Sequence, residues 1–269
     1  MRIRPDSLSS ARGYARFAGF TRATLRNLAG VAAQTEADAR RLTDLGAIEV
    51  HVCGNIKFDR APRPQDLELG SRLRASFGAR PVFLAASTRE CEEQLVLAAV
   101  AVAAADLVAG LQFLTVIVPR HPQRFDEVAR LLEQRGIGFE RRSDHRPVSA
   151  DTSVLLGDSM GELYAFYAAC DVAFVGGSLV PLGGQNLLEA CAVGKPVLVG
   201  PHTFNFVEAT QLAVNAAAAH QVRDEKELGQ TLAQLFMQPD KRRRMSQAGL
   251  ALMRQHQGAA RRIVALLKV

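Results

Sequence analysis

The chain has 269 residues, 48% of them hydrophobic, and a formal net charge of +6 at pH 7. This length and apolar content allow one large domain or two modest ones with a buried core. The positive charge favours phosphates or an anionic membrane surface, but it is scattered and not interleaved with aromatic side chains, which argues against nucleic acid as a partner. The alternative interpretation is an ordinary soluble surface with a surplus of arginine.

The four cysteines form no Cys-x-x-Cys pair, and they indicate a reducing cytosol rather than a disulfide framework. The six histidines include no close pair, so we expect no metal site. The longest apolar run, Leu95 to Ala105, is too short to span a bilayer, and the first residues lack the apolar stretch of a signal peptide. Membrane association is therefore expected to come from the surface, or from a segment outside this chain.

The N-terminal part of the sequence predicts one small βαβ piece. A basic helix is predicted over residues 9–28, a strand over 30–34, a helix over 36–45 capped by Thr35, and a strand over 49–53. One helix cannot cover both faces of such a piece, so we expect the remnant of a domain cut off at its start, poorly packed over residues 1–53. Two prolines within residues 59–66 indicate a linker, which divides the chain into residues 1–58 and 59–269.

From residue 66 onward, predicted helices and strands alternate. The helices cover residues 66–77, 90–105, 124–135, 160–169, 186–193 and 207–218, with two more at the C-terminus, and the strands cover 81–86, 112–118, 139–141, 154–156, 172–175, 197–199 and 221–222. This alternation is typical of a parallel sheet with right-handed crossovers. We predict an α/β domain with a Rossmann-like, doubly wound parallel sheet.

The stretch from Gly176 to Pro201 reads as strand, glycine loop, helix and strand. Gly183 and Gly184 precede the predicted helix, and a helix start offers unpaired N–H groups that glycines let a phosphate approach. Glu189, one turn into the helix, is placed to accept hydrogen bonds from a ribose diol. The alternative is an ordinary tight crossover, because short glycine motifs are common in such loops.

Polar residues follow three further strands, and in a parallel sheet these strand ends meet at the edge where ligands bind. The loops begin at Ser87-Thr88, Pro119-Arg120 and Gly157-Asp158. Arg120 suits a phosphate because its guanidinium offers parallel donors, although a surface ion pair is the alternative. Gly161 and Glu162 open another helix, where Ser159 and Glu162 alternatively form a capping box.

The sequence contains no Gly-x-Ser-x-Gly nucleophile motif and no P-loop. Glu92 and Glu93 are neighbours on a predicted helix and face different ways, so they do not form a catalytic pair.

Five motifs, occurring in order, resemble the 3-deoxy-D-manno-octulosonic acid (Kdo) transferases of lipopolysaccharide synthesis. They are Gly54-Asn-Ile-Lys-Phe-Asp59, Ala86-Ser-Thr-Arg-Glu-Cys-Glu-Glu93, Val118-Pro-Arg-His-Pro-Gln-Arg-Phe125, Gly157-Asp-Ser-Met-Gly-Glu162 and the stretch from Gly176 to Phe206. The resemblance runs from about Ser9 to the C-terminus. It implies a GT-B glycosyltransferase with two Rossmann-like domains, no cofactor, CMP-Kdo as donor and lipid A precursor (lipid IVA) as acceptor.

The resemblance also implies which residues contact CMP. Those contacts fall on Pro119, Arg120, Met160, Gly161, Glu162, Asn186, Leu187, Leu188 and Glu189, while Ser87, Thr88 and Gly184 are expected to line the same cleft. Two departures stand out. The family usually has glycine where this sequence has Cys91, and family members carry roughly 150 further residues before the position of Ser9, about the size of one more domain.

That additional half carries, by the resemblance, the membrane anchor, the acceptor face and the glutamate general base. We therefore expect residues 59–269 to be the CMP-Kdo-binding domain, at the cytoplasmic face of the bacterial inner membrane, and the isolated chain to bind CMP without transferring Kdo. Two alternatives are a GT-B enzyme that uses a UDP-sugar, and a non-catalytic donor-binding fragment that docks a separately encoded N-terminal half.

Overall fold

The computed structural model describes residues 17–108 and 111–267, and the chain divides into two compact units. The first unit contains the described residues up to Arg60 together with those from Arg254 onward, and the second runs from Ala61 to Met253. The sequence-based division assigned everything after residue 58 to the second domain, so the structure differs in grouping the last residues with the first unit. The first part of the helix predicted over residues 9–28 lies outside the described residues.

The first unit is built on a two-stranded parallel sheet. Strands β1 (Val31–Ala33) and β2 (Val50–Val52) pair with Val31 opposite Val50, as the predicted βαβ piece requires. Helix α3 (Glu36–Asp44) connects them, and the Thr35 side chain accepts the backbone N–H of Asp38 at 3.1 Å. Together with helix α2 (Ala18–Arg26), these elements enclose a small buried cluster of Leu25, Ala33, Leu42 and Ala47.

The C-terminal helix α12 (Ala259–Leu266) belongs to the same unit. The carboxylate of Asp59, the last residue of the 3-10 helix η1 (Ile56–Asp59), accepts the backbone N–H groups of Gly258 and Ala260, both at 2.5 Å. Arg262 donates to the carbonyl of Cys53 at 2.8 Å. The linker expected over residues 59–66 is shorter, since α4 already begins at Pro64.

The second unit contains a seven-stranded, all-parallel sheet, which confirms the predicted doubly wound α/β fold. Its strand order is β5-β6-β4-β3-β7-β8-β9. The strands are β3 (Val82–Thr88), β4 (Leu114–Pro119), β5 (Phe139–Arg141), β6 (Val154–Leu156), β7 (Val172–Val175), β8 (Val197–Val199) and β9 (Ala219–Gln221). The central strands are apolar runs because both of their faces are covered.

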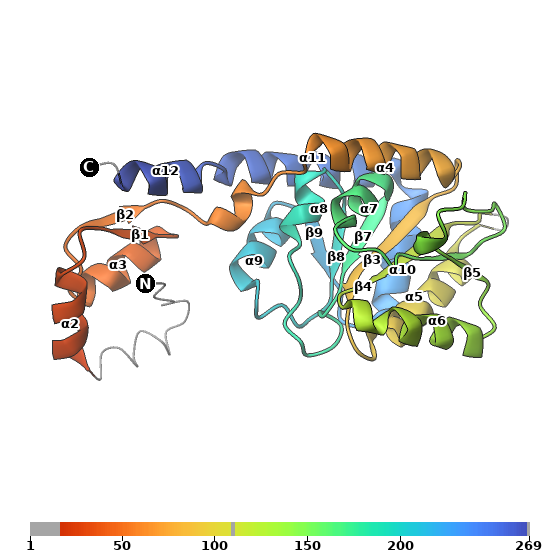
Figure 1. The fold of residues 1–269 in the computed structure, drawn as a ribbon, viewed down its shortest axis with the longest axis horizontal. Coiled ribbons are helices and arrows are strands. Elements are labelled where there is room, and N and C mark those ends of the chain that lie inside the picture. Colours follow the sequence, from red (N-terminus) through yellow and green to blue (C-terminus); the bar gives the residue numbers. More distant parts are fainter. Residues whose placement is uncertain (1–16, 109–110, 268–269) are drawn as a thin grey trace. The chain divides into compact units, whose positions relative to one another are not determined.

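Helices cover both faces of this sheet (Figure 1). They are α4 (Pro64–Ser76), α5 (Glu92–Asp106), α6 (Phe125–Gln134), α7 (Leu163–Ala169), α8 (Leu188–Ala192), α9 (Val207–Asn215), α10 (Glu225–Met237) and α11 (Pro239–His256), with short 3-10 turns η2 (Pro122–Arg124) and η3 (Arg142–Asp144). Three helices follow β9, counting α12, where the sequence predicted two.

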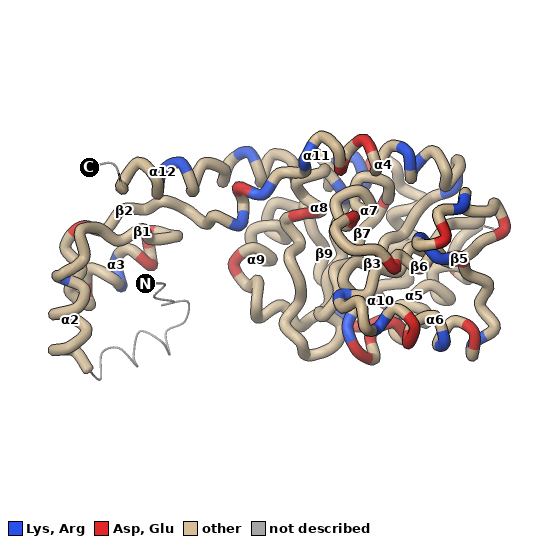
Figure 2. The backbone as a smooth tube through the Cα atoms, in the orientation of Figure 1, with Lys and Arg blue, Asp and Glu red and all other residues tan. Residues whose placement is uncertain are grey.

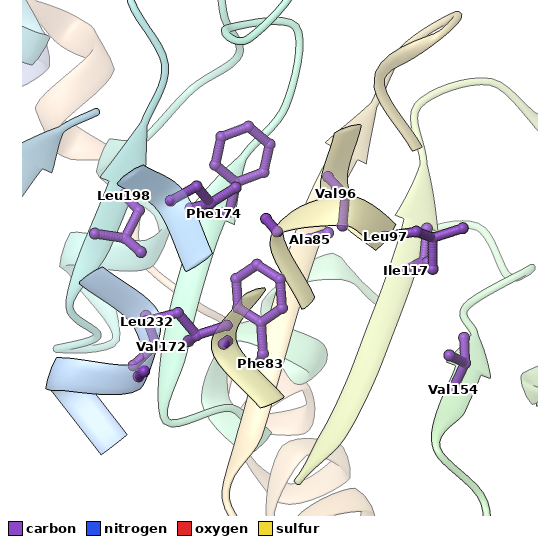
Figure 3. Packing of buried hydrophobic residues seen from close by; sticks show 14 of the residues in the cluster. Phe83, Ala85, Val96, Leu97, Ile117, Val154, Val172, Phe174, Leu198 and Leu232 are labelled. Atoms are coloured by element: carbon purple, nitrogen blue, oxygen red, sulfur yellow. The ribbon is translucent and has the colours of Figure 1, made fainter. Parts of the chain in front are cut away.

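The main core lies on the face covered by α5, α6 and α10. Side chains alternate along a strand, so Phe83 of β3 and Val172 of β7 share this face with Leu232 of α10, as Figure 3 shows. On the opposite face α4 packs against α7, and the ring of Phe166 lies beside Gly157 and Val118. This two-layer cover leaves the carboxyl ends of the strands as the edge where loops gather.

Candidate functional site

The carboxyl ends of four neighbouring strands lie along one edge of the sheet. The backbone N–H of Arg120 donates to the carbonyl of Thr88 at 3.0 Å, which joins the ends of β3 and β4. Gly176 donates to Ala86 at 2.8 Å, which joins β7 to β3, and Gly157 extends β6 beside β4 in the same way. The sequence-based expectation that these loops share one edge is therefore confirmed.

The loops after β3 and β4 contain the first group of predicted site residues. Ser87 is buried and has a φ of +57°, a strained backbone conformation for a residue with a side chain. Thr88 is fully buried, and its hydroxyl donates to Glu93 at 2.7 Å. Pro119 is buried as the last residue of β4, whereas Arg120 is exposed, and its guanidinium forms no hydrogen bond or ion pair with any residue that the structure describes.

The loop between β6 and α7 contains the second group. Met160 is exposed, and Gly161 has a φ of +80° with open space around its Cα. The Glu162 carboxylate receives two hydrogen bonds from Arg142, both at 3.0 Å, and one from the Ser159 hydroxyl at 2.6 Å. Helix α7 begins at Leu163, three residues later than predicted, and Ser159 bonds a side chain rather than the helix backbone, so the capping box is not present.

The segment between β7 and α8 contains the third group. Helix α8 has five residues and begins at Leu188, two residues after Asn186, near which the sequence predicted its start. The Asn186 amide donates to the Glu189 carboxylate at 3.2 Å and accepts the backbone N–H of Leu188 at 3.3 Å. Because the side chains of Leu187 and Leu188 are fully buried, Asn186 and Glu189 supply the polar atoms of this segment.

The residues from Gly176 to Gly184, here called the glycine loop, bind a carboxylate of the chain itself. Glu92 accepts the backbone N–H groups of Gly177 at 2.6 Å, and of Ser178 and Leu179 at 3.0 Å each. Burial raises the pKa of Glu92 above its ordinary value, although these N–H groups favour the charged form. The glycines here were predicted to admit a phosphate. Instead, the N–H groups of Gly177, Ser178 and Leu179 donate to Glu92, a pairing that the sequence did not indicate.

The neighbouring carboxylate, Glu93, faces a different loop. Arg124 of η2 donates to both of its oxygens, at 2.7 and 2.9 Å, and a further bond links Arg124 to Glu127 at 3.0 Å. Burial by itself lowers the pKa of Arg124, but the hydrogen bonds to Glu93 and Glu127 raise it above its ordinary value. The prediction that Glu92 and Glu93 face different ways is confirmed, and Figure 2 shows charges of both signs where α5 and α6 begin.

Two cavities of the second unit lie away from the predicted site residues. One, of about 240 Å³, is lined by α5 and α6 and includes Cys91 and Arg124. The other, of about 420 Å³, is lined by residues that include Arg80 and Thr115. No group of three or more His, Cys, Asp or Glu side chains within residues 17–108 and 111–267 is arranged to hold a metal ion. Over the same residues, no helix combines the length and the apolar character needed to cross a membrane.

Comparison with known proteins identifies relatives for both parts of the chain. A family model for 3-deoxy-D-manno-octulosonic-acid transferase (kdotransferase) matches residues 6–60, and one for glycosyl transferases group 1 matches residues 138–251. A 3-deoxy-D-manno-octulosonic acid transferase of Bordetella pertussis is 43% identical over 98% of this chain, and one of Haemophilus influenzae is 35% identical over 97%. The chain spans 63% and 62% of the lengths of these two relatives.

Solved structures agree with these matches. The C-terminal CMP-Kdo binding domain of WaaA from Acinetobacter baumannii is 31% identical, with a TM-score of 0.66 over 71% of this chain and 99% of that domain. A complex of Anabaena HepE with UDP and glucose covers 99% of this chain and 69% of that one at a TM-score of 0.55, but its 17% identity indicates a shared fold alone. The strand order, the motifs and these matches together show that the chain belongs to the Kdo transferase family and has the α/β fold of GT-B glycosyltransferases.

Proposed function

We propose that this chain supplies the donor-binding part of an enzyme that transfers Kdo from CMP-Kdo to lipid A precursor (lipid IVA) in lipopolysaccharide core synthesis. The main support is the 31% identical WaaA domain, which is described as binding CMP-Kdo and which this chain covers almost completely. In such a transfer a lipid hydroxyl attacks the anomeric carbon of Kdo, the bond to the phosphate oxygen breaks, and CMP leaves. We place this reaction at the cytoplasmic face of the inner membrane, where an anionic surface suits a chain of charge +6.

Arg120 is the group that we assign to the CMP phosphate. Its guanidinium is exposed at the carboxyl edge of the sheet and is not engaged by a carboxylate among the described residues. The amides of Gly177 to Leu179 are already bonded to Glu92, so they are not the phosphate site. As CMP leaves, negative charge builds up on the phosphate, and a cation at that position stabilises it.

Asn186 and Glu189 are the groups that we assign to the ribose. A carboxylate accepts hydrogen bonds from two neighbouring hydroxyl groups, and Glu189 is held by the amide of Asn186 at 3.2 Å. Gly161, with its positive φ and open surroundings, lets the backbone of the loop before α7 approach the nucleotide closely.

The test is calorimetric titration of the full chain with CMP and with UDP. We expect CMP to bind more tightly than UDP, and Arg120→Ala to weaken CMP binding about tenfold or more, because a hydrogen bond to a charged group contributes about 1.5–3 kcal/mol. Arg130→Ala removes an exposed arginine from α6 and serves as the control. Failure of the wild-type chain to bind CMP refutes the donor assignment, and tighter binding of UDP favours a UDP-sugar enzyme instead.

A further inference from the structure

The glycine loop is hydrogen-bonded to Glu92, a residue outside the proposed CMP contacts. We propose that Glu92 is a positioning residue for the nucleotide site: its buried carboxylate fixes the glycine loop and, through it, the segment that contains Asn186 and Glu189. This inference rests on the proposed CMP site and deepens it. Glu92 itself contacts no nucleotide.

The carboxylate of Glu92 uses both oxygens to hold the backbone. Oε2 accepts the N–H groups of Gly177 at 2.6 Å and of Arg89 at 3.1 Å, and Oε1 accepts those of Ser178 and Leu179 at 3.0 Å each. Hydrogen bonds to an ionised acceptor are stronger than neutral ones. Three of these four bonds join the start of α5 to the glycine loop, which lies 85 to 87 positions later in the sequence, and the fourth is local.

The fixed part of the loop is connected directly to the proposed ribose-binding segment. The carbonyl of Gly177 accepts the N–H of Gly184 at 2.7 Å, two residues before Asn186. Ser178 extends the connection to β8, because its hydroxyl donates to Val175 at 2.5 Å and accepts the N–H of Gly200 at 2.8 Å. The orientation of Gly177 therefore determines the position of Gly184, and the orientation of Ser178 determines that of Gly200 after β8.

The packing around Gly176 is tight. A Cβ atom on Gly176 would lie 2.6 Å from the Ser87 carbonyl oxygen and 2.8 Å from Glu92 Oε2. Glutamine at position 92 has the same shape as glutamate, but its amide nitrogen cannot accept a hydrogen bond. Whichever way that amide is turned, it faces two backbone N–H groups with an N–H group of its own, so the loop must move away from it.

The experiment measures CMP affinity and backbone amide spectra for the full chain with Glu92→Gln. We expect the dissociation constant to rise at least about tenfold, and the amide signals of residues 184–189 to shift before any ligand is added. The matched control is Asp66→Asn, since Asp66 is also a buried carboxylate that accepts a backbone N–H, that of Arg63 at 3.0 Å, but it lies at the start of α4. That variant should lose stability, keep its affinity for CMP and leave the signals of residues 184–189 in place.

The outcomes separate this inference from the proposed function. If the wild-type chain does not bind CMP, the proposed function fails. If the wild type binds and folded Glu92→Gln binds equally well, the positioning role is refuted. Should Glu92→Gln not fold, Glu92→Asp replaces it, because it keeps the charge and withdraws the carboxylate by one methylene; an unchanged affinity in that variant refutes the role as well.

Discussion

Replacing Arg124 with leucine should strongly destabilise the second unit. The side chain of Glu93 is 2% exposed, and Arg124 is the cation that donates to both of its oxygens. In Arg124→Leu, the Thr88 hydroxyl is the one donor left to Glu93 among the residues that the structure describes. Removing one partner of a buried ion pair typically costs about 3–5 kcal/mol, because it leaves an uncompensated charge. We expect a loss of this size in the free energy of unfolding at pH 7.

The double variant Arg124→Leu/Glu93→Leu tests the cause. It removes both charges, so it should recover at least about 2 kcal/mol relative to Arg124→Leu.

Urea unfolding followed by tyrosine fluorescence suits this measurement. The chain has three tyrosines and no tryptophan, and Tyr164 and Tyr167 both lie in α7 of the second unit. Arg130→Leu, on the exposed side of α6, should change stability by no more than about 0.5 kcal/mol. A loss below about 1.5 kcal/mol in Arg124→Leu, or a double variant no more stable than the single one, would refute the assignment of the energy to a desolvated pair.

Two further predictions follow from packing and burial. Gly176→Ala should destabilise the second unit by about 1–3 kcal/mol, because the new methyl group meets backbone atoms at 2.6 and 2.7 Å, whereas Gly138→Ala, with open space around it, should change urea unfolding little. Of the four cysteines, only Cys91 is exposed, and burial raises the pKa values of Cys170 and Cys191 to about 12. A chromogenic disulfide reagent at pH 8 should therefore react quickly with one thiol per folded chain and with none in Cys91→Ser; a second fast thiol would contradict this.

The sheet could be predicted from the sequence because its strands are buried on both faces. Every residue of β3 and β4 is buried, so each strand is a mainly apolar run between loops, and the alternation with helices gives the parallel topology. The positions of the candidate loops follow from the same reasoning, since a parallel sheet brings the carboxyl ends of its strands together.

The local Thr35 cap of α3 was predicted, but the starts of α7 and α8 and the long-range polar partners were not. The long-range partners depend on residues distant in the sequence. Glu162 resembles the first residue of a helix, but in the structure its carboxylate binds Arg142, 20 positions earlier. The return of the C-terminal segment to the first unit depends on hydrogen bonds between Asp59 and residues 199 and 201 positions later. No local pattern contains such pairings, so the sequence-based boundary assigned these last residues to the second domain.

Glu92 and Glu93 illustrate why the roles of two polar side chains could not be distinguished from the sequence. In the sequence they are two identical neighbours at the start of a helix. Within the part of the chain that the structure describes, Glu92 accepts backbone N–H groups alone, whereas Glu93 is bonded by an arginine and a threonine. Their negative charges are therefore compensated by dipoles in one case and by a cation in the other. Both carboxylates are therefore satisfied within the protein, and neither competes for Arg120. An exposed cation that no carboxylate of the described residues engages can attract a phosphate, which is why we propose Arg120 for phosphate recognition rather than the amides that the glycines first suggested.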